Sequence, residues 1–208
     1  MGMVHLSDPA MAGQARKMSS RTGDILTVDW LIDEVKERVR RTVESAKVSK
    51  KVDEKLLEPI TIGAIKYSVL KSGTGQDVAF DIDQSVTLNG DSGPYLQYTY
   101  VRTQSILKKD KILKIKDKRL LAENRLNPEE KAVARDLIYF PEIVESAAEK
   151  LAPNLLAEYL FELAQEFNLF YQKHKIADDA RRLEITAAVG QVLKNGLNLL
   201  GIETVEVM

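Results

Sequence analysis

The chain of 208 residues has 44% hydrophobic and 29% charged residues, the composition of a folded globular protein. Its formal net charge is -1, from 30 Lys and Arg against 31 Asp and Glu, which excludes a protein that is basic along its whole length. The absence of cysteine excludes disulfides, thiol nucleophiles and cysteine-ligated metals, and the presence of only two histidines nearly excludes a multi-histidine metal site. No apolar run reaches the roughly 20 residues of a membrane helix, and no signal-peptide pattern is present. We therefore expect a soluble chain without a bound metal or a membrane partner.

The N-terminal portion is predicted to contain helices and one short strand. Glycine, proline and polar residues within 1–24 are typical of an irregular arm and loop. Apolar residues at three-to-four-residue steps predict three helices, over residues 28–43, 47–58 and 60–70. Thr27 is placed to cap the first of these helices, in which we expect Trp30 to be packed. Alternating apolar and polar residues over 78–83 predict a short strand, and a turn follows over 90–93.

From residue 93 the chain is predicted to be helical to its end. Pro94 can begin the first of these helices. Each later helix has its own start signal, namely a capping box from Asn127 to Glu130, first-turn prolines at Pro141 and Pro153, and a cap at Asp178 or Asp179. Gly201 is placed to end the last helix in a left-handed conformation. The fold class is therefore mainly α, with a bundle of about four or five helices over 93–208. A smaller α-rich piece with a short β segment precedes it over 1–92.

Charge is unevenly distributed along the chain. Between Arg102 and Arg125 there are nine basic and three acidic residues, whereas residues 126–208 contain eight basic and fourteen acidic residues. The basic stretch has two interpretations, an anion-binding surface or a solvated, lysine-rich linker. Nucleic-acid binding needs aromatic or geometric support beyond the charge itself.

A polar loop near the N-terminus has the residue types that bind phosphate. Its string KMSSR combines two hydroxyls with two cations, although most loops of this kind are merely exposed. The five residues concerned are Lys17, Met18, Ser19, Ser20 and Arg21. This string resembles the KMSKS signature loop of class I aminoacyl-tRNA synthetases, and the resemblance implies that these five residues contact the phosphates of ATP.

Several longer strings resemble one family of that class, the arginyl-tRNA synthetases. The strings IGAIKYSVL, VAFDID and GDSGPYLQYTYVRTQSIL are similar to the junction between the catalytic and anticodon-binding domains. The strings AEYLFELAQEFNLFY and ARRLEITAAVGQVLKNGLNLLGIETVEVM are similar to the C-terminal helices of the family. The resemblance runs from about Arg16 to Met208 and implies two parts. Residues 1–92 would be the end of a catalytic domain that includes the signature loop, and residues 93–208 a helical anticodon-binding domain.

Two departures from the family pattern limit what the chain is expected to do alone. Ser20 stands where the signature normally has lysine, with Arg21 following, and neither a HIGH-like string nor a nucleotide-binding βαβ unit occurs. We therefore expect a C-terminal piece of a ligase that joins arginine to its tRNA with ATP and Mg2+. Because positioning of the reactants supplies most of the rate, we expect this piece by itself to bind neither cofactor and to be inactive.

Aromatic residues offer a second kind of site. Tyr95 and Tyr98 are three residues apart, so they share one helix face, and Tyr171 ends a later helix. Unpaired bases of an anticodon loop can stack on such rings, although tyrosines at helical spacing are also found packed in a core. The resemblance implies that these tyrosines and Met208 line the pocket for the anticodon bases. Arg102, two turns after Tyr95, is placed to contact phosphate.

Lys108, Lys109 and Lys111 either continue the backbone contact beyond Arg102 or are simply exposed. One of Arg181 and Arg182 is expected to pair with an acid of the bundle rather than with RNA. The expected partner is arginine tRNA, with arginine and ATP bound through the missing catalytic portion, in a cytoplasmic monomer. Two alternatives stay open: the equivalent domain of another class I ligase, such as the cysteinyl one, and a structural helical bundle without an RNA role.

Overall fold

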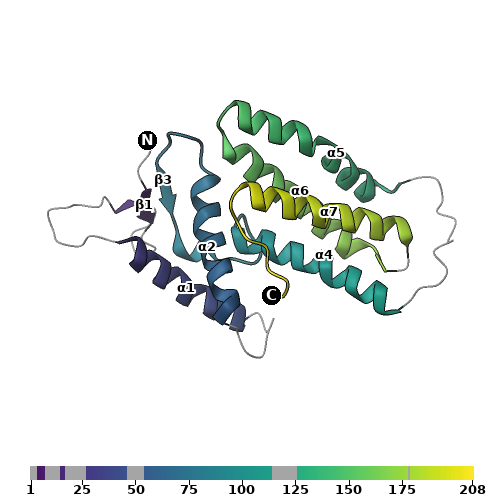
Figure 1. Ribbon diagram of the computed structural model, residues 1–208, viewed down its shortest axis with the longest axis horizontal. Coiled ribbons are helices and arrows are strands. Elements are labelled where there is room, and N and C mark those ends of the chain that lie inside the picture. The colour runs from purple at the N-terminus through teal and green to yellow at the C-terminus, as the bar shows by residue number, and fades with distance from the viewer. Residues whose placement is uncertain (1–3, 8–14, 17–26, 46–53, 114–125, 178) are drawn as a thin grey trace.

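Helices dominate the computed structural model, which describes residues 4–7, 15–16, 27–45, 54–113, 126–177 and 179–208 (Figure 1). The helices are α1 (Val28–Ser45), α2 (Glu54–Leu70), α3 (Ile82–Ser85), α4 (Gly93–Leu113), α5 (Pro128–Glu149), α6 (Pro153–Lys173) and α7 (Ala180–Leu199). The strands are β1 (Val4–Ser7), β2 (Ala15–Arg16) and β3 (Val78–Phe80). The mainly α fold class, with a helical bundle after a smaller mixed piece, is confirmed. None of the helices in the described ranges is both long and apolar enough to span a membrane.

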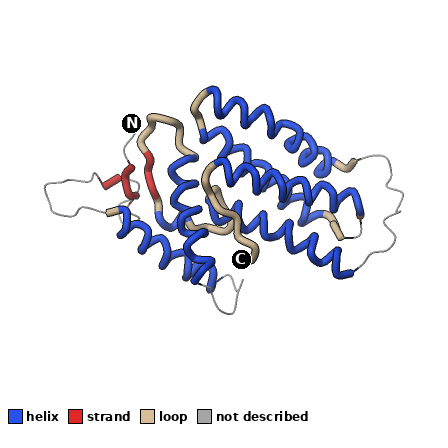
Figure 2. The backbone as a smooth tube through the Cα atoms, in the orientation of Figure 1, coloured by secondary structure: helices blue, strands red, loops and turns tan. Residues whose placement is uncertain are grey.

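A small sheet lies at the N-terminal end of the molecule (Figure 2). Its order is β2-β1-β3, with β1 antiparallel to β2 and parallel to β3, so that Val4 pairs with Val78 and Leu6 with Phe80. The expectation of an irregular arm was therefore wrong for β1 and β2. Strands of four and two residues are too short to show periodicity, and the pairing that orders β1 is with residues far along the chain.

The first two helices pack together on their apolar stripes. Val35, Val39 and Val43 of α1 are 0–4% exposed, and Thr27 caps the helix by accepting a hydrogen bond from the Trp30 N–H at 3.2 Å. The Trp30 side chain itself is 41% exposed, so the expectation that it is packed was wrong.

Two prolines at expected helix boundaries, Pro59 between the helices expected over 47–58 and 60–70 and Pro141 in an expected first turn, lie inside continuous helices. Pro59 lies within α2 and Pro141 within α5. Each removes one backbone hydrogen bond, but the apolar stripe continues on both sides. Leu57, Ile60 and Ala64 are buried around Pro59, and packing on this scale outweighs a single lost bond.

The remaining start and stop signals are confirmed. The Asn127 side chain accepts from the Glu130 N–H at 2.8 Å, and the Glu130 carboxylate accepts from the Asn127 N–H at 3.0 Å. Pro153 begins α6, Asp179 caps α7 by accepting from the N–H groups of its first turn, and Gly201 has φ 67°.

The helical bundle and the N-terminal piece share one hydrophobic core. Helix α2 packs against α4, and the backbones approach so closely that a Cβ on Gly93 would lie 2.3 Å from the Gly63 carbonyl oxygen. The C-terminal tail, residues 201–208, runs back across the helices toward α4 (Figures 1 and 2) and buries Ile202, Val205 and Met208. The expected division between residues 1–92 and 93–208 stays a prediction, since the core crosses it.

Side chains of α2 and α4 hold this tail by its backbone. Lys66 Nζ donates to the Gly201 carbonyl at 2.5 Å. Gln97 Nε2 donates to the Glu203 carbonyl at 2.7 Å and to the Pro59 carbonyl at 3.1 Å. A single side chain of α4 therefore joins the tail to α2.

A fully buried carboxylate joins the N-termini of α5 and α7. Glu130 is 0% exposed, and its Oε1 accepts from Arg182 Nε at 2.8 Å while its Oε2 lies 3.2 Å from Arg181 Nη2. The expectation that one of these arginines pairs with an acid of the bundle is confirmed, and both do so.

Replacement of this carboxylate is expected to destabilise the fold. Glu130→Ala removes the nearer carboxylate of two partly buried guanidinium groups, which keep longer contacts with Asp179 at 3.7 and 3.9 Å. It should lower the free energy of unfolding by about 1.5–3 kcal/mol. Urea denaturation measures the loss, with Glu184→Ala on the exposed face of α7 as the control. A loss equal to that of the control would contradict this account of Glu130.

Glu129, the neighbouring residue, joins the first turn of α5 to the end of α6. Its carboxylate accepts from Lys173 Nζ at 2.6 Å and lies 3.2 Å from His174 Nε2. The hydrogen bond from Lys173, with smaller effects of the backbone and of His174, lowers the pKa of Glu129 from 4.5 to about 2.

This lowered pKa predicts a pH dependence. The ionised Glu129 stabilises the fold above its unfolded pKa of 4.5, and this stabilisation is lost as the pH falls toward about 2. In Glu129→Gln, the urea midpoint should therefore depend less on pH over this range than in the parent chain. Glu142→Gln, on the exposed face of the same helix, is the control. Parallel curves for the parent chain and Glu129→Gln would contradict the prediction.

Candidate nucleic-acid interface

Helices α4 and α6 bring together four of the residues singled out from the sequence. Tyr95, Tyr98 and Arg102 lie on one face of α4, and Tyr171 lies near the end of α6. The Arg102 Cζ is 4.8 Å from the centroid of the Tyr98 ring and 5.0 Å from that of Tyr171. We call these four residues the tyrosine–arginine cluster. The guanidinium is close enough to both rings for cation–π attraction.

The buried side-chain amide of Asn168 is hydrogen-bonded to two residues of the cluster. Asn168, one turn before Tyr171 on α6, is 8% exposed. Its Oδ1 accepts from Arg102 Nη1, and its Nδ2 donates to Tyr95 Oη at 2.9 Å and to Thr99 Oγ1 at 3.0 Å. Asn168 and Thr99 were missed from the sequence. The one available signal was a polar residue within the apolar run FNLFY of α6.

The rings of the cluster are open to solvent to different degrees. Tyr171 is 41% exposed, whereas Tyr95, Tyr98 and Arg102 are half-buried. The Tyr95 ring packs edge-on against Phe161 at 5.7 Å between centroids. These rings are therefore not sealed in the core, which was the alternative interpretation of tyrosines at helical spacing.

Arg102 differs from the other arginines whose side chains are described. Each of those pairs with a carboxylate, and they are Arg38, Arg40, Arg41, Arg135, Arg181 and Arg182. Within the described part of the chain, no carboxylate lies within ion-pair distance of Arg102. Among the described residues its charge therefore has no carboxylate partner, which suits a group that contacts RNA phosphate.

The other predicted residues lie in different surroundings. Met208 is only 7% exposed and packs in the hydrophobic core, so its role beside the tyrosines stays a prediction. Lys108 and Lys109 are exposed near the end of α4, and Lys109 follows Arg102 by two turns. The signature-loop residues Lys17, Met18, Ser19, Ser20 and Arg21, and the side chain of Lys111, lie outside the described residues.

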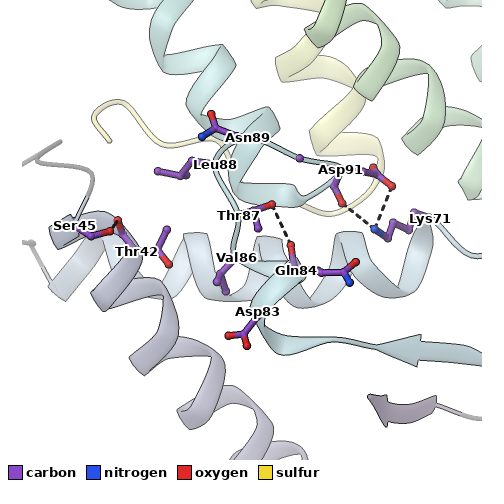
Figure 3. A pocket seen from close by; sticks show the side chains of 11 residues that line it. Thr42, Ser45, Lys71, Asp83, Gln84, Val86, Thr87, Leu88, Asn89 and Asp91 are labelled. Carbon is purple, nitrogen blue, oxygen red and sulfur yellow. Dashed lines mark hydrogen bonds and ion pairs between the residues drawn. The ribbon is translucent and has the colours of Figure 1, made fainter. Parts of the chain in front are cut away.

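A hollow of about 720 Å³ lies away from the cluster, between the end of α1, α3 and the loop before α4 (Figure 3). The cation that lines this hollow is Lys71. Its Nζ donates to the backbone carbonyl of Asp91 at 2.8 Å and lies 3.1 Å from the Asp91 carboxylate. Asp83 is the other charged residue of the hollow and pairs with Arg38. These charges are already paired, so the hollow is less suited to a polyanion than the tyrosine–arginine cluster. No described group of His, Asp and Glu is arranged to hold a metal ion.

Comparisons with known proteins agree with the helical bundle. Residues 96–208 match the family model described as DALR anticodon binding domain. The chain is 33% identical to an arginine–tRNA ligase of Ignicoccus hospitalis over 97% of its own length and 32% of that protein. It is also 33% identical to one of Clostridium perfringens over 99% of its length and 37% of that protein.

Solved structures give the same result. The Thermus thermophilus arginyl-tRNA synthetase matches with a TM-score of 0.78 at 28% identity, covering 99% of this chain and 34% of that one. The Plasmodium falciparum arginyl-tRNA synthetase matches with a TM-score of 0.73 at 26% identity, covering 88% and 34%. The fold and these matches define an anticodon-binding domain of the aminoacyl-tRNA synthetase type. The chain belongs to the DALR anticodon binding domain family, and the resemblance to arginyl-tRNA synthetases is confirmed. It spans about a third of the length of the relatives that it matches.

Proposed function

We propose that this chain binds the anticodon loop of arginine tRNA as part of an arginine–tRNA ligase. The observation that carries the proposal is the tyrosine–arginine cluster. Its guanidinium has no described carboxylate at ion-pair distance and lies within about 5 Å of the half-buried Tyr98 ring and the exposed Tyr171 ring. Anticodon bases are unpaired, so they can stack on tyrosine, and each stacked base contributes roughly 1–3 kcal/mol. The guanidinium of Arg102 and the exposed Lys109 would meet the phosphates beside those bases.

The ligase would supply the chemistry outside this domain. By the resemblance of KMSSR to the signature loop, Lys17, Met18, Ser19, Ser20 and Arg21 would hold the phosphates of ATP during arginine activation. The ligase would use Mg2+ and form arginyl-adenylate before transfer to the tRNA. The 208-residue chain, a monomer by this proposal, would not activate arginine by itself, because its sequence contains no HIGH-like string.

Truncation of a ring tests the RNA site. Tyr98→Ala should weaken binding of arginine tRNA by about 1–3 kcal/mol, roughly five-fold to more than a hundred-fold in Kd, because one stacking surface is removed. Filter binding measures Kd, with an arginine tRNA of altered anticodon as the second ligand. Tyr139→Ala, which removes a 48% exposed tyrosine of α5, is the matched control.

A structural bundle without an RNA role predicts the opposite result. Both tRNAs would then bind equally and weakly, with affinity set by salt alone. A large fall in the melting temperature of Tyr98→Ala would show instead that this ring is part of the core.

Arginine-dependent exchange between ATP and pyrophosphate tests the second part of the proposal. The purified 208-residue chain, supplied with arginine and tRNA, should show none, because half of the reactant-positioning machinery is missing. The full-length Clostridium perfringens ligase is the positive control. Exchange above background by the 208-residue chain would contradict the proposal.

A further inference from the structure

The chemistry of its partners fixes the orientation of the Asn168 amide. A guanidinium can only donate, so the Asn168 oxygen must face Arg102 and the nitrogen must face the two hydroxyls. The Thr99 hydroxyl donates its proton to the Tyr95 carbonyl at 2.9 Å, which leaves its oxygen free to accept from Asn168. All hydrogen-bonding groups of the amide are therefore engaged by α4, and two of the engaged residues belong to the tyrosine–arginine cluster.

Asn168 is neutral, whereas each of the other arginines whose side chains are described pairs with a carboxylate. Arg182, for example, is held by the buried carboxylate of Glu130, which fixes the guanidinium and also cancels its charge. Asn168 fixes Arg102 by one hydrogen bond and leaves the charge intact. The other N–H groups of Arg102 stay available between the rings of Tyr98 and Tyr171.

We infer that Asn168 is a positioning residue for RNA binding: it holds the Arg102 guanidinium between Tyr98 and Tyr171 without neutralising it, so that an RNA phosphate can provide the counter-charge. This inference rests on the proposed function and adds a residue that does not itself touch the ligand. The inference requires two properties of the Asn168 side chain that can be tested separately: it holds Arg102, and it carries no charge.

Two substitutions separate these demands. Asn168→Asp keeps the shape and can accept hydrogen bonds from Arg102 and from the Tyr95 hydroxyl, but it neutralises the guanidinium. The slope of log K against log salt for arginine tRNA should become shallower by about 0.7–0.9, which is a five- to eightfold weaker Kd at 0.1 M salt. Asn168→Ala releases Arg102 without adding charge, so the slope should stay while Kd weakens about two- to tenfold from the cost of ordering a free side chain.

Three controls accompany these variants. Asn198→Asp makes the same charge change at an exposed position of α7 and should leave Kd and slope unchanged. Thr99→Val removes another hydrogen bond of Asn168 without touching Arg102, so it should lower the melting temperature but not the slope. Arg102→Gln should reproduce the shallower slope of Asn168→Asp.

The outcomes distinguish this inference from the proposed function. If Arg102→Gln gives a shallower slope while Asn168→Asp keeps the parent Kd and slope, the inference is overturned and the RNA site stands. Parent-like binding by Asn168→Ala would also overturn it. If the parent chain binds arginine tRNA and the altered-anticodon tRNA equally, the proposed function fails, whatever the Asn168 variants show. If Asn168→Asp does not fold, the slope and Kd of Asn168→Ala still test whether Asn168 holds Arg102 in place.

Discussion

The contact of α4 with α6 includes one buried side-chain amide, that of Asn168, whose oxygen and nitrogen need hydrogen-bond partners within the protein. Asn168 is 8% exposed. A buried amide without hydrogen-bond partners lowers the stability of a protein by about 1–3 kcal/mol, as judged from protein variants. The partners of Asn168 all come from one face of α4, so the amide holds that face of the helix against α6. On this helix Tyr98 and Arg102 are half-buried, whereas Leu96 and Tyr100 are buried in the core. The face of α4 that carries the tyrosine–arginine cluster is therefore held by this contact with α6.

Local signals were the most reliable part of the sequence for the fold. Caps and stops at Asn127, Asp179 and Gly201 involve backbone groups within a few residues, so their chemistry is readable without tertiary context. The sheet was not readable in this way, because β1 is ordered by β3 across a long separation. The predicted helix boundaries at Pro59 and Pro141 were wrong for a related reason. Each proline does remove a backbone hydrogen bond, but packing with residues far along the chain outweighs that loss.

For the candidate site, the sequence predicted which residues share one face of a helix, but it did not predict which helix faces pack against each other. The spacing of Tyr95, Tyr98 and Arg102 places them together on any α-helix. The approach of Tyr171 depends on the packing of α4 against α6, which only the family resemblance indicated beforehand. Asn168 had no spacing signal at all. Its importance comes from burial and from the chemistry of its partners, which are properties of the folded chain.

The close approach of Gly63 and Gly93 has a mechanical consequence. Backbones in contact leave no room for a compliant layer of side chains, and Gln97 fastens α4 both to α2 and to the tail. Interiors packed in this way are stiff and transmit displacement instead of absorbing it. A macromolecule bound at the tyrosine–arginine cluster, in the first half of α4, would consequently be held at a fixed distance from α2. We therefore expect the contact of α2 with α4 to be rigid and not to act as a hinge.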